Sequence, residues 1–145
     1  MNKDHLVRTA KAMVAPGKGI LAADESAGTI AKRFAAIEVE STQATRRDYR
    51  ELLFRAEDAI RRHISGIILF DETIRQTAAD GTPLVKLIET GGALPGVKAD
   101  IGAKPLANFP GETITEGGDG LRERLHEYRR LGARFAKWRA IIDID

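Results

Sequence analysis

The stretch Gly17-Lys18-Gly19-Ile20-Leu21-Ala22-Ala23-Asp24-Glu25-Ser26 decides the fold of this chain. An apolar run from Gly19 to Ala23 leads directly into two carboxylates and a hydroxyl. Burying a charged side chain is costly unless the charge is paired or is used on a ligand. The stretch therefore predicts a strand whose carboxyl end lies at a functional site.

Further apolar stretches predict three more strands, at residues 66–70, 94–97 and 134–143. Helical patterns lie between them. An order in which strands alternate with helices is typical of right-handed βαβ units. The sequence therefore predicts an α/β fold with a parallel sheet, and its 145 residues are expected to form a single domain, 1–145.

The expected helices are recognised by apolar residues at offsets of three and four positions. One such stripe runs from Tyr49 through Leu52 to Ile60 and predicts one continuous helix. The expected helix starts are Thr29, Ser41 or Thr42, and Thr82 with Pro83 at the first helical position. Residues 103–118 are rich in Gly, Pro and Thr and predict a loop.

The composition limits the function classes. The 23 basic and 21 acidic residues nearly cancel, which does not indicate a nucleic-acid partner. There is no cysteine for a disulfide or a thiolate zinc site, and the three histidines lie far apart, so no metal is expected. No apolar run approaches the roughly 20 residues that span a bilayer, and no signal-peptide core is present. A cytoplasmic protein without a membrane partner is the expectation.

Ionisable side chains lie at the ends of three predicted strands. Asp24 ends the first strand and Lys98 ends the third. Alternation along the last strand places Phe135, Lys137 and Arg139 on one face. Barrel enzymes build their active sites at the carboxyl ends of several parallel strands, and Asp24, Lys98 and Lys137 fit that arrangement. A structural ion pair between Asp24 and one of the lysines would give the same pattern, and both interpretations stay open.

The residues after this first strand offer an anion site. Ser26 and Thr29 carry hydroxyls, Gly28 lets the backbone approach closely, and the following helix presents free N–H groups. An ordinary capped helix start is the alternative. Arg33 and Arg46 lie on predicted helices, where arginines are usually solvated.

Six stretches, taken together and in order, resemble the amino-terminal part of class I, or Schiff-base, fructose-bisphosphate aldolase. They are GKGILAADESAGTIAKR at 17–33, RRDYRELL at 46–53, GIILFDET at 66–73, GVKAD at 96–100, GDGL at 118–121 and FAKWR at 135–139. The resemblance implies the first half, about four β/α units, of a (β/α)8 TIM barrel with parallel strands. It also implies a lyase of glycolysis that cleaves fructose 1,6-bisphosphate reversibly to dihydroxyacetone phosphate and glyceraldehyde 3-phosphate.

The resemblance implies a role for each candidate residue. Asp24 matches the aspartate that works beside the Schiff base, and Lys137 matches the lysine that supports Schiff-base formation without forming the imine itself. The residues implied to bind substrate phosphate or to line the site are Ser26, Thr29, Arg33, Arg46, Lys98 and Arg139. No metal or other cofactor is implied, because an iminium acts as the electron sink.

The resemblance further implies parts that this sequence does not contain. Family chains are more than twice as long, and their Schiff-base lysine, two glutamates and second phosphate site lie beyond Asp145. We therefore expect a truncated barrel whose open sheet edges favour self-association. The alternative function is a non-catalytic fragment that binds phosphate or pairs with a full-length aldolase. A sugar phosphate is the expected partner, and the commonly tetrameric family implies a homo-oligomer.

Overall fold

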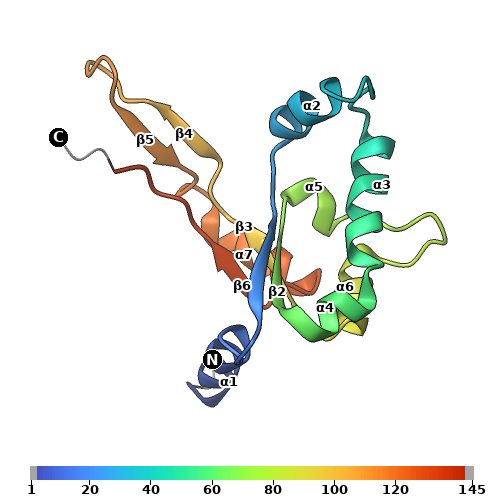
Figure 1. Ribbon diagram of the computed structural model, residues 1–145. Coiled ribbons are helices and arrows are strands. Elements are labelled where there is room, and N and C mark those ends of the chain that lie inside the picture. The colour runs from blue at the N-terminus through green and yellow to red at the C-terminus, as the bar shows by residue number, and fades with distance from the viewer. Residues whose placement is uncertain (1–2, 143–145) are drawn as a thin grey trace.

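A parallel sheet of four strands forms the centre of the computed structural model, which describes residues 3–142 (Figure 1). Its strands lie side by side in the order β1 (Gly19–Ala23), β2 (Ile64–Leu69), β3 (Leu94–Lys98) and β6 (Phe135–Lys137). Each strand thus neighbours the next one of the sheet along the chain, as expected for successive βαβ units. The predicted α/β fold with a parallel sheet is confirmed.

Helices form most of the connections between these strands. They are α1 (Lys3–Met13) before β1; α2 (Ala27–Ala35), α3 (Gln43–Phe54) and α4 (Glu57–His63) before β2; α5 (Asp71–Ile74) and α6 (Leu84–Thr90) before β3; and α7 (Leu121–Arg130) before β6. An antiparallel hairpin of β4 (Gly102–Pro105) and β5 (Thr113–Glu116) is inserted between β3 and α7. In Figure 1 this hairpin projects away from the parallel sheet.

Alternation along the strands separates the core from the site. Ile67, Leu69 and Val97 are at most 1% exposed and belong to the apolar core that the helices share. Gly66 of β2 and Gly96 of β3 alternate with these core residues, and the ring of Phe135 covers them on the opposite face of the sheet. A Cβ atom on Gly96 would lie 2.3 Å from that ring. Side chains in step with Phe135 therefore leave the sheet on the face away from this core.

Two helix starts differ from the prediction. Helix α2 begins after Ser26 rather than at Thr29, because the Ser26 hydroxyl accepts a hydrogen bond from the Thr29 N–H at 3.4 Å. Thr82 does not cap α6, whose N-cap is Pro83 and has no side-chain cap bond. The N–H of Thr82 is instead bound by the Asp80 carboxylate at 2.9 Å in the preceding turn.

The single helix predicted to reach Ile60 is two helices. Thr42 caps α3 as predicted, but the helix ends at Phe54, and Ala56 has a ψ of 57°, outside the helical range. The apolar spacing runs through the break because Phe54 and Ile60 enter the same core. Leu52, expected on the buried stripe, is 73% exposed.

The chain between β3 and β6 also departs from the prediction. Most of the loop expected at 103–118 is the β4–β5 hairpin, in which Gly102 and Gly117 have φ values of 98° and 124°. Such values favour glycine, so these residues mark turns around a strand pair. The last strand ends at Lys137 because its partner β3 ends at Lys98, the residue paired with it. The predicted end at residue 143 lies outside the described residues.

Candidate active site

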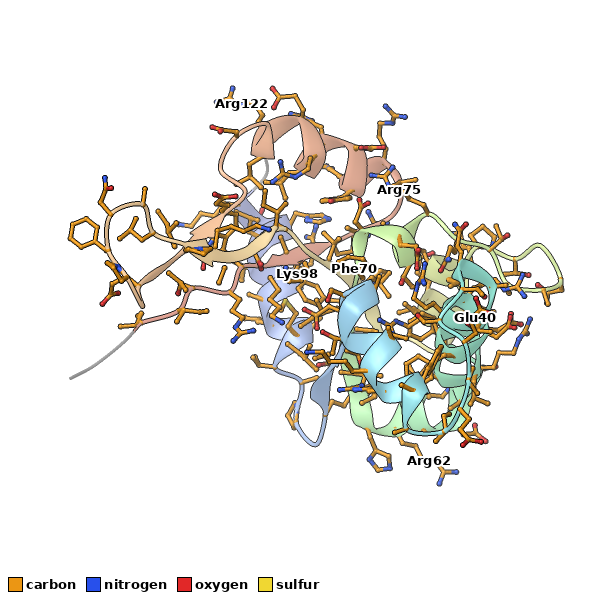
Figure 2. The ribbon with its side chains drawn as sticks, turned by 90° about the horizontal axis from the view of Figure 1, so that it is seen from above. Glu40, Arg62, Phe70, Arg75, Lys98 and Arg122 are labelled. Carbon is orange, nitrogen blue, oxygen red and sulfur yellow. The ribbon has the colours of Figure 1, made fainter. Side chains whose placement is uncertain are left out.

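The carboxyl ends of the parallel strands border a cavity of about 830 Å³. Figure 2 looks down on this edge of the sheet, where Lys98 and Phe70 lie near the middle of the view. Six of the residues predicted from the sequence line the cavity: Asp24, Ser26, Thr29, Lys98, Lys137 and Arg139. The rule that ionisable residues at strand ends converge on one site therefore holds for this sheet.

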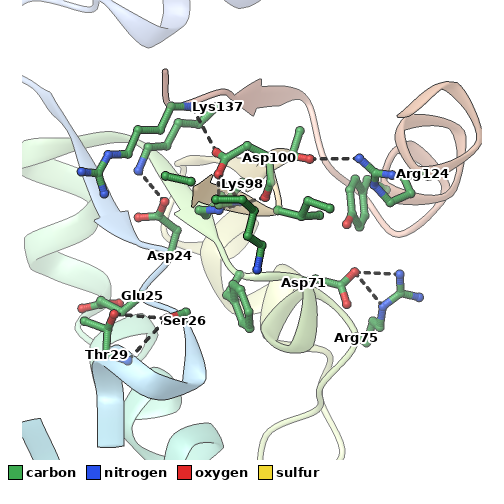
Figure 3. Close-up of a pocket in the computed structure, with 18 of the residues that line it drawn as sticks. Asp24, Glu25, Ser26, Thr29, Asp71, Arg75, Lys98, Asp100, Arg124 and Lys137 are labelled. Atoms are coloured by element: carbon green, nitrogen blue, oxygen red, sulfur yellow. Dashed lines mark hydrogen bonds and ion pairs between the residues drawn. The ribbon is translucent and has the colours of Figure 1, made fainter. Parts of the chain in front are cut away.

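Asp24 and Lys137 meet across the cavity, although β1 and β6 are the outer strands of the sheet. The Lys137 Nζ donates to Asp24 Oδ2 at 2.5 Å (Figure 3). The Asp24 side chain is 8% exposed and that of Lys137 is 32% exposed. The ion pair that the sequence left open is thus present. It lies on the cavity wall, where a ligand can reach the ammonium.

Lys98 has a different partner, Asp100, which the sequence analysis assigned no role. The Lys98 Nζ donates to the Asp100 carboxylate and, at 2.8 Å, to its carbonyl oxygen. Burial pushes the pKa of Asp100 upward, but hydrogen bonds from Lys98 and from the N–H groups of Arg139 and Gly102 outweigh burial and leave the pKa below its ordinary value. The carboxylate therefore stays ionised at neutral pH and fixes the ammonium at the wall.

The start of α2 contributes hydroxyls to the same cavity. The oxygens of Ser26 and Thr29 are 3.1 Å apart, and both residues line the cavity (Figure 3). The first turn of a helix also presents N–H groups and the positive end of the helix dipole. The capped helix start and the proposed anion site are therefore one structure, and the two interpretations do not exclude each other.

Arg33 lies beside the cavity rather than in its lining, and pairs with Glu25. Glu25 is also held by Arg50, whose Nη2 is 2.9 Å from Glu25 Oε2 and donates to the Glu25 carbonyl at 3.1 Å. Burial lowers the pKa of Arg50, which is 2% exposed, and the charge of Glu25 opposes that effect. The Arg33 side chain is 56% exposed, so it can turn away while Arg50 still neutralises Glu25.

Arg46 lies outside the cavity lining. Its Nε and Nη2 donate to the two carboxylate oxygens of Glu72 at 2.8 and 2.6 Å, and its Nη1 donates to the Ser41 carbonyl at 3.0 Å. The bond to Glu72 raises the pKa of Arg46. All three nitrogens thus bond within the protein, and Arg46 is not among the residues that line this cavity.

The opposite wall carries charged residues that the sequence analysis missed. Arg75 pairs with both Glu127 and Asp71, and these bonds raise the pKa of Arg75. A signal for two of the missed residues was present in the sequence. Asp71 and Asp100 each lie within two positions of a strand end, the same placement that identified Asp24. The contact between Arg75 and Glu127 joins distant parts of the chain and carries no such signal.

The cavity lining includes the ammonium groups of Lys98 and Lys137, the hydroxyls of the α2 start and the largely buried Asp24 carboxylate, which together can bind an anionic ligand and move a proton. Within residues 3–142 no group of three or more His, Asp or Glu side chains is arranged to hold a metal ion. No helix in that part of the chain is both long enough and apolar enough to cross a membrane.

Known proteins resemble this chain closely. The family described as "Glycolytic: Fructose-bisphosphate aldolase class-I" matches residues 5–145. The "Probable fructose-bisphosphate aldolase class 1" of Xanthomonas campestris pv. campestris is 58% identical over 144 residues, which cover 99% of this chain and 43% of that protein. The "Fructose-bisphosphate aldolase, cytoplasmic isozyme 1" of Pisum sativum is 49% identical over 141 residues, which cover 97% of this chain and 39% of that protein.

A solved structure shows the same arrangement of elements. Fructose-bisphosphate aldolase from Plasmodium falciparum, in complex with TRAP and a small-molecule inhibitor, matches with a TM-score of 0.93 and 46% identity. The match covers 98% of this chain and 41% of that chain. This chain therefore spans about two fifths of the length of its relatives. The expected fold, the first part of a (β/α)8 barrel, is confirmed.

Proposed function

This chain belongs to the class I fructose-bisphosphate aldolase family, and on that premise we propose that it serves the reversible cleavage of fructose 1,6-bisphosphate to dihydroxyacetone phosphate and glyceraldehyde 3-phosphate. The observation that carries the proposal is the Asp24–Lys137 pair, which shares one cavity with Lys98. Cleaving a sugar bisphosphate requires cations for the phosphates and a group that moves the proton of the C4 hydroxyl. The cavity offers both kinds of group.

In this proposal Asp24 moves the C4 hydroxyl proton, and Lys137 compensates the charge on Asp24 and binds the sugar hydroxyls. The iminium that drains electrons from the breaking carbon–carbon bond requires an amine that attacks in its neutral form. Lys137 and Lys98 are unsuited to that step because each ammonium is held by a carboxylate, that of Asp24 or that of Asp100. Neither lysine is therefore assigned the imine, and in this proposal the amine comes from the remaining barrel, which the relatives have beyond the part that matches this chain.

The distal phosphate is proposed to lie against Lys98, Ser26 and Thr29. The hydroxyls donate hydrogen bonds to the phosphate oxygens, and the ammonium compensates their charge. Arg33 joins this site by turning from Glu25 to the phosphate, and Arg139 adds a further cation on the cavity wall. Arg46 is left out because its guanidinium is occupied by Glu72 and Ser41.

The direct test is a cleavage assay with fructose 1,6-bisphosphate on a complete barrel, in which this chain is joined to the remaining barrel of a family member, comparing wild type with Asp24→Asn. Removing a general acid/base costs roughly 10²- to 10⁴-fold in rate. We expect a kcat loss of that size with bisphosphate binding largely kept. No cleavage by the wild-type protein, or an Asp24→Asn variant as active as wild type, contradicts the proposal.

Borohydride trapping with dihydroxyacetone phosphate, read by intact-mass and peptide analysis, tests the roles of the two lysines. A reduced adduct on Lys98 or on Lys137 contradicts the roles proposed for them. Absence of an adduct from both lysines is the expected result, since their ammonium groups are paired.

The cellular setting is also a proposal. We place the protein in the cytoplasm and in glycolysis, as a homo-oligomer with a sugar phosphate as its ligand. The relative from Pisum sativum is named a cytoplasmic isozyme, and the matching family is described as glycolytic, which supports this placement. Light scattering on the purified protein measures the oligomeric state, and a monomer at all concentrations contradicts that part.

A further inference from the structure

Asp100 makes more contacts at the strand ends than any role assigned so far requires. It is 5% exposed and lies just after β3. One carboxylate oxygen, Oδ1, accepts from the Lys98 ammonium and, at 3.1 Å, from the Gly102 N–H. The other, Oδ2, accepts from the Arg139 N–H at 3.0 Å. Both oxygens are thus used, and they bind three separate points of the chain.

These three points belong to different parts of the cavity wall. Lys98 ends β3, Gly102 begins the β4–β5 hairpin, and Arg139 follows β6 by two residues. The pairing of β3 with β6 ends at Lys98 and Lys137, so beyond it no ladder hydrogen bond fixes Arg139. The Asp100 carboxylate replaces that missing ladder contact. A charge-assisted bond to a buried carboxylate is stronger than an ordinary backbone bond.

We propose that Asp100 is a positioning residue, which sets both Lys98 and Arg139 in place to bind the phosphate-bearing ligand. The inference rests on the proposed function, because it assumes that these two cations meet a phosphate. Asp100 itself reaches the ligand only through them. Its side chain is 1% exposed, whereas that of Lys98 is 16% exposed and faces the cavity.

A simpler role would give the opposite result for anion binding. If Asp100 were only a negative charge beside Lys98, its removal would free the ammonium and strengthen phosphate binding. If Asp100 positions the ammonium, its removal leaves a flexible lysine that must be ordered by the ligand, and binding weakens. The sign of the change therefore separates the two roles.

The test is phosphate binding to Asp100→Asn, followed by the amide shifts of the ¹⁵N-labelled protein during titration with inorganic phosphate. We expect affinity to fall roughly tenfold relative to wild type. In the cleavage assay the same variant should raise KM for fructose 1,6-bisphosphate with little change in kcat, as the loss of a contact made equally in the ground state and the transition state does. Unchanged or tighter phosphate binding by Asp100→Asn overturns the inference.

Asp119→Asn is the matched control. It removes the same charge from an exposed carboxylate just before α7, outside the cavity lining. Phosphate affinity should change by less than about twofold, because the charge of an exposed carboxylate is screened by solvent and salt. A tenfold loss in this control as well would assign the effect to net charge and overturn the inference.

One measurement uses the wild-type protein and therefore does not depend on whether a variant folds. Scalar couplings across hydrogen bonds, from the amide nitrogens of Arg139 and Gly102 to the carboxyl carbon of Asp100, report those contacts directly. If the couplings are present, they support the role proposed for Asp100, and their absence overturns it. Failure of the proposed function looks different, because wild-type protein that ignores phosphate refutes the phosphate site itself, whatever Asp100 does.

Discussion

Gly96→Ala should destabilise the fold because the new methyl group would strike the ring of Phe135. The expected loss in the free energy of unfolding can be estimated from the structure. A Cβ on Gly96 would lie 2.3 Å from the ring, roughly 1 Å short of ordinary van der Waals contact. The clash forces the ring away from its place beside Gly66 and Gly96, where β6 pairs with β3. Overpacking of this kind costs about 1–3 kcal/mol. Urea unfolding followed by circular dichroism measures the loss.

Two other glycines serve as graded controls. A Cβ on Gly66 would lie 3.0 Å from the same ring, so Gly66→Ala should cost less than Gly96→Ala. Gly28 lies in α2 with nothing within 4 Å of its Cβ position. Gly28→Ala should therefore leave stability unchanged or raise it by up to roughly 1 kcal/mol, the helix preference of alanine.

A double-mutant cycle gives the decisive result. Phe135→Leu removes the ring that the new methyl group of Gly96→Ala would strike. The double variant should then lose less stability than the two single losses combined, with a coupling of about 1 kcal/mol or more. Additive losses, or a Gly96→Ala protein as stable as wild type, would refute the packing described here for β2, β3 and β6.

Further predictions concern charged residues. Lys137→Met should lower the free energy of unfolding by roughly 1–2 kcal/mol in urea titrations, because it leaves the buried Asp24 carboxylate unpaired. Solvent that reaches part of the site keeps the loss small. No loss would show that the pair contributes nothing to stability. Glu25→Gln should cost more stability than Arg50→Met in the same assay, since the first leaves a buried guanidinium without its carboxylate and the second leaves Glu25 its other arginine; the reverse order contradicts this. An arginine and a backbone N–H hold the pKa of Asp80 at about 2. Because that pKa is below the value of an unfolded chain, the Asp80 carboxylate stabilises the fold above about pH 4 and loses its contribution as the pH falls. Asp80→Asn should therefore unfold with a flatter pH dependence below pH 4, and an unchanged acid limb would contradict the assignment.

The parts of the fold that follow from local patterns could be predicted from the sequence. The strand from Gly19 to Ala23 has the predicted bounds, since an apolar run between glycine and a carboxylate has few other solutions. The convergence of Asp24, Lys98 and Lys137 followed from a general property of parallel sheets. Asp24 pairs with Lys137 and not with Lys98. Which lysine it meets depends on how the sheet curves.

Contacts between distant parts of the chain could not be predicted in this way. The buried Arg50 lies on a helix, where arginines are usually solvated, and its contact with Glu25 joins residues that are 25 positions apart. The ion pair between Arg46 and Glu72 joins residues 26 positions apart and could not be read from the sequence. The β4–β5 hairpin was not predicted, because the glycines and prolines around its short strands favour a loop.

A crystal structure of the protein with hexitol 1,6-bisphosphate, a reduced analogue that cannot be cleaved, would show which side chains hold the ligand. We expect one phosphate against Ser26, Thr29 and Lys98, with the sugar hydroxyls between Asp24 and Lys137. A bisphosphate bound elsewhere on the protein, or a fully occupied ligand that touches neither Lys98 nor Lys137, would contradict this expectation.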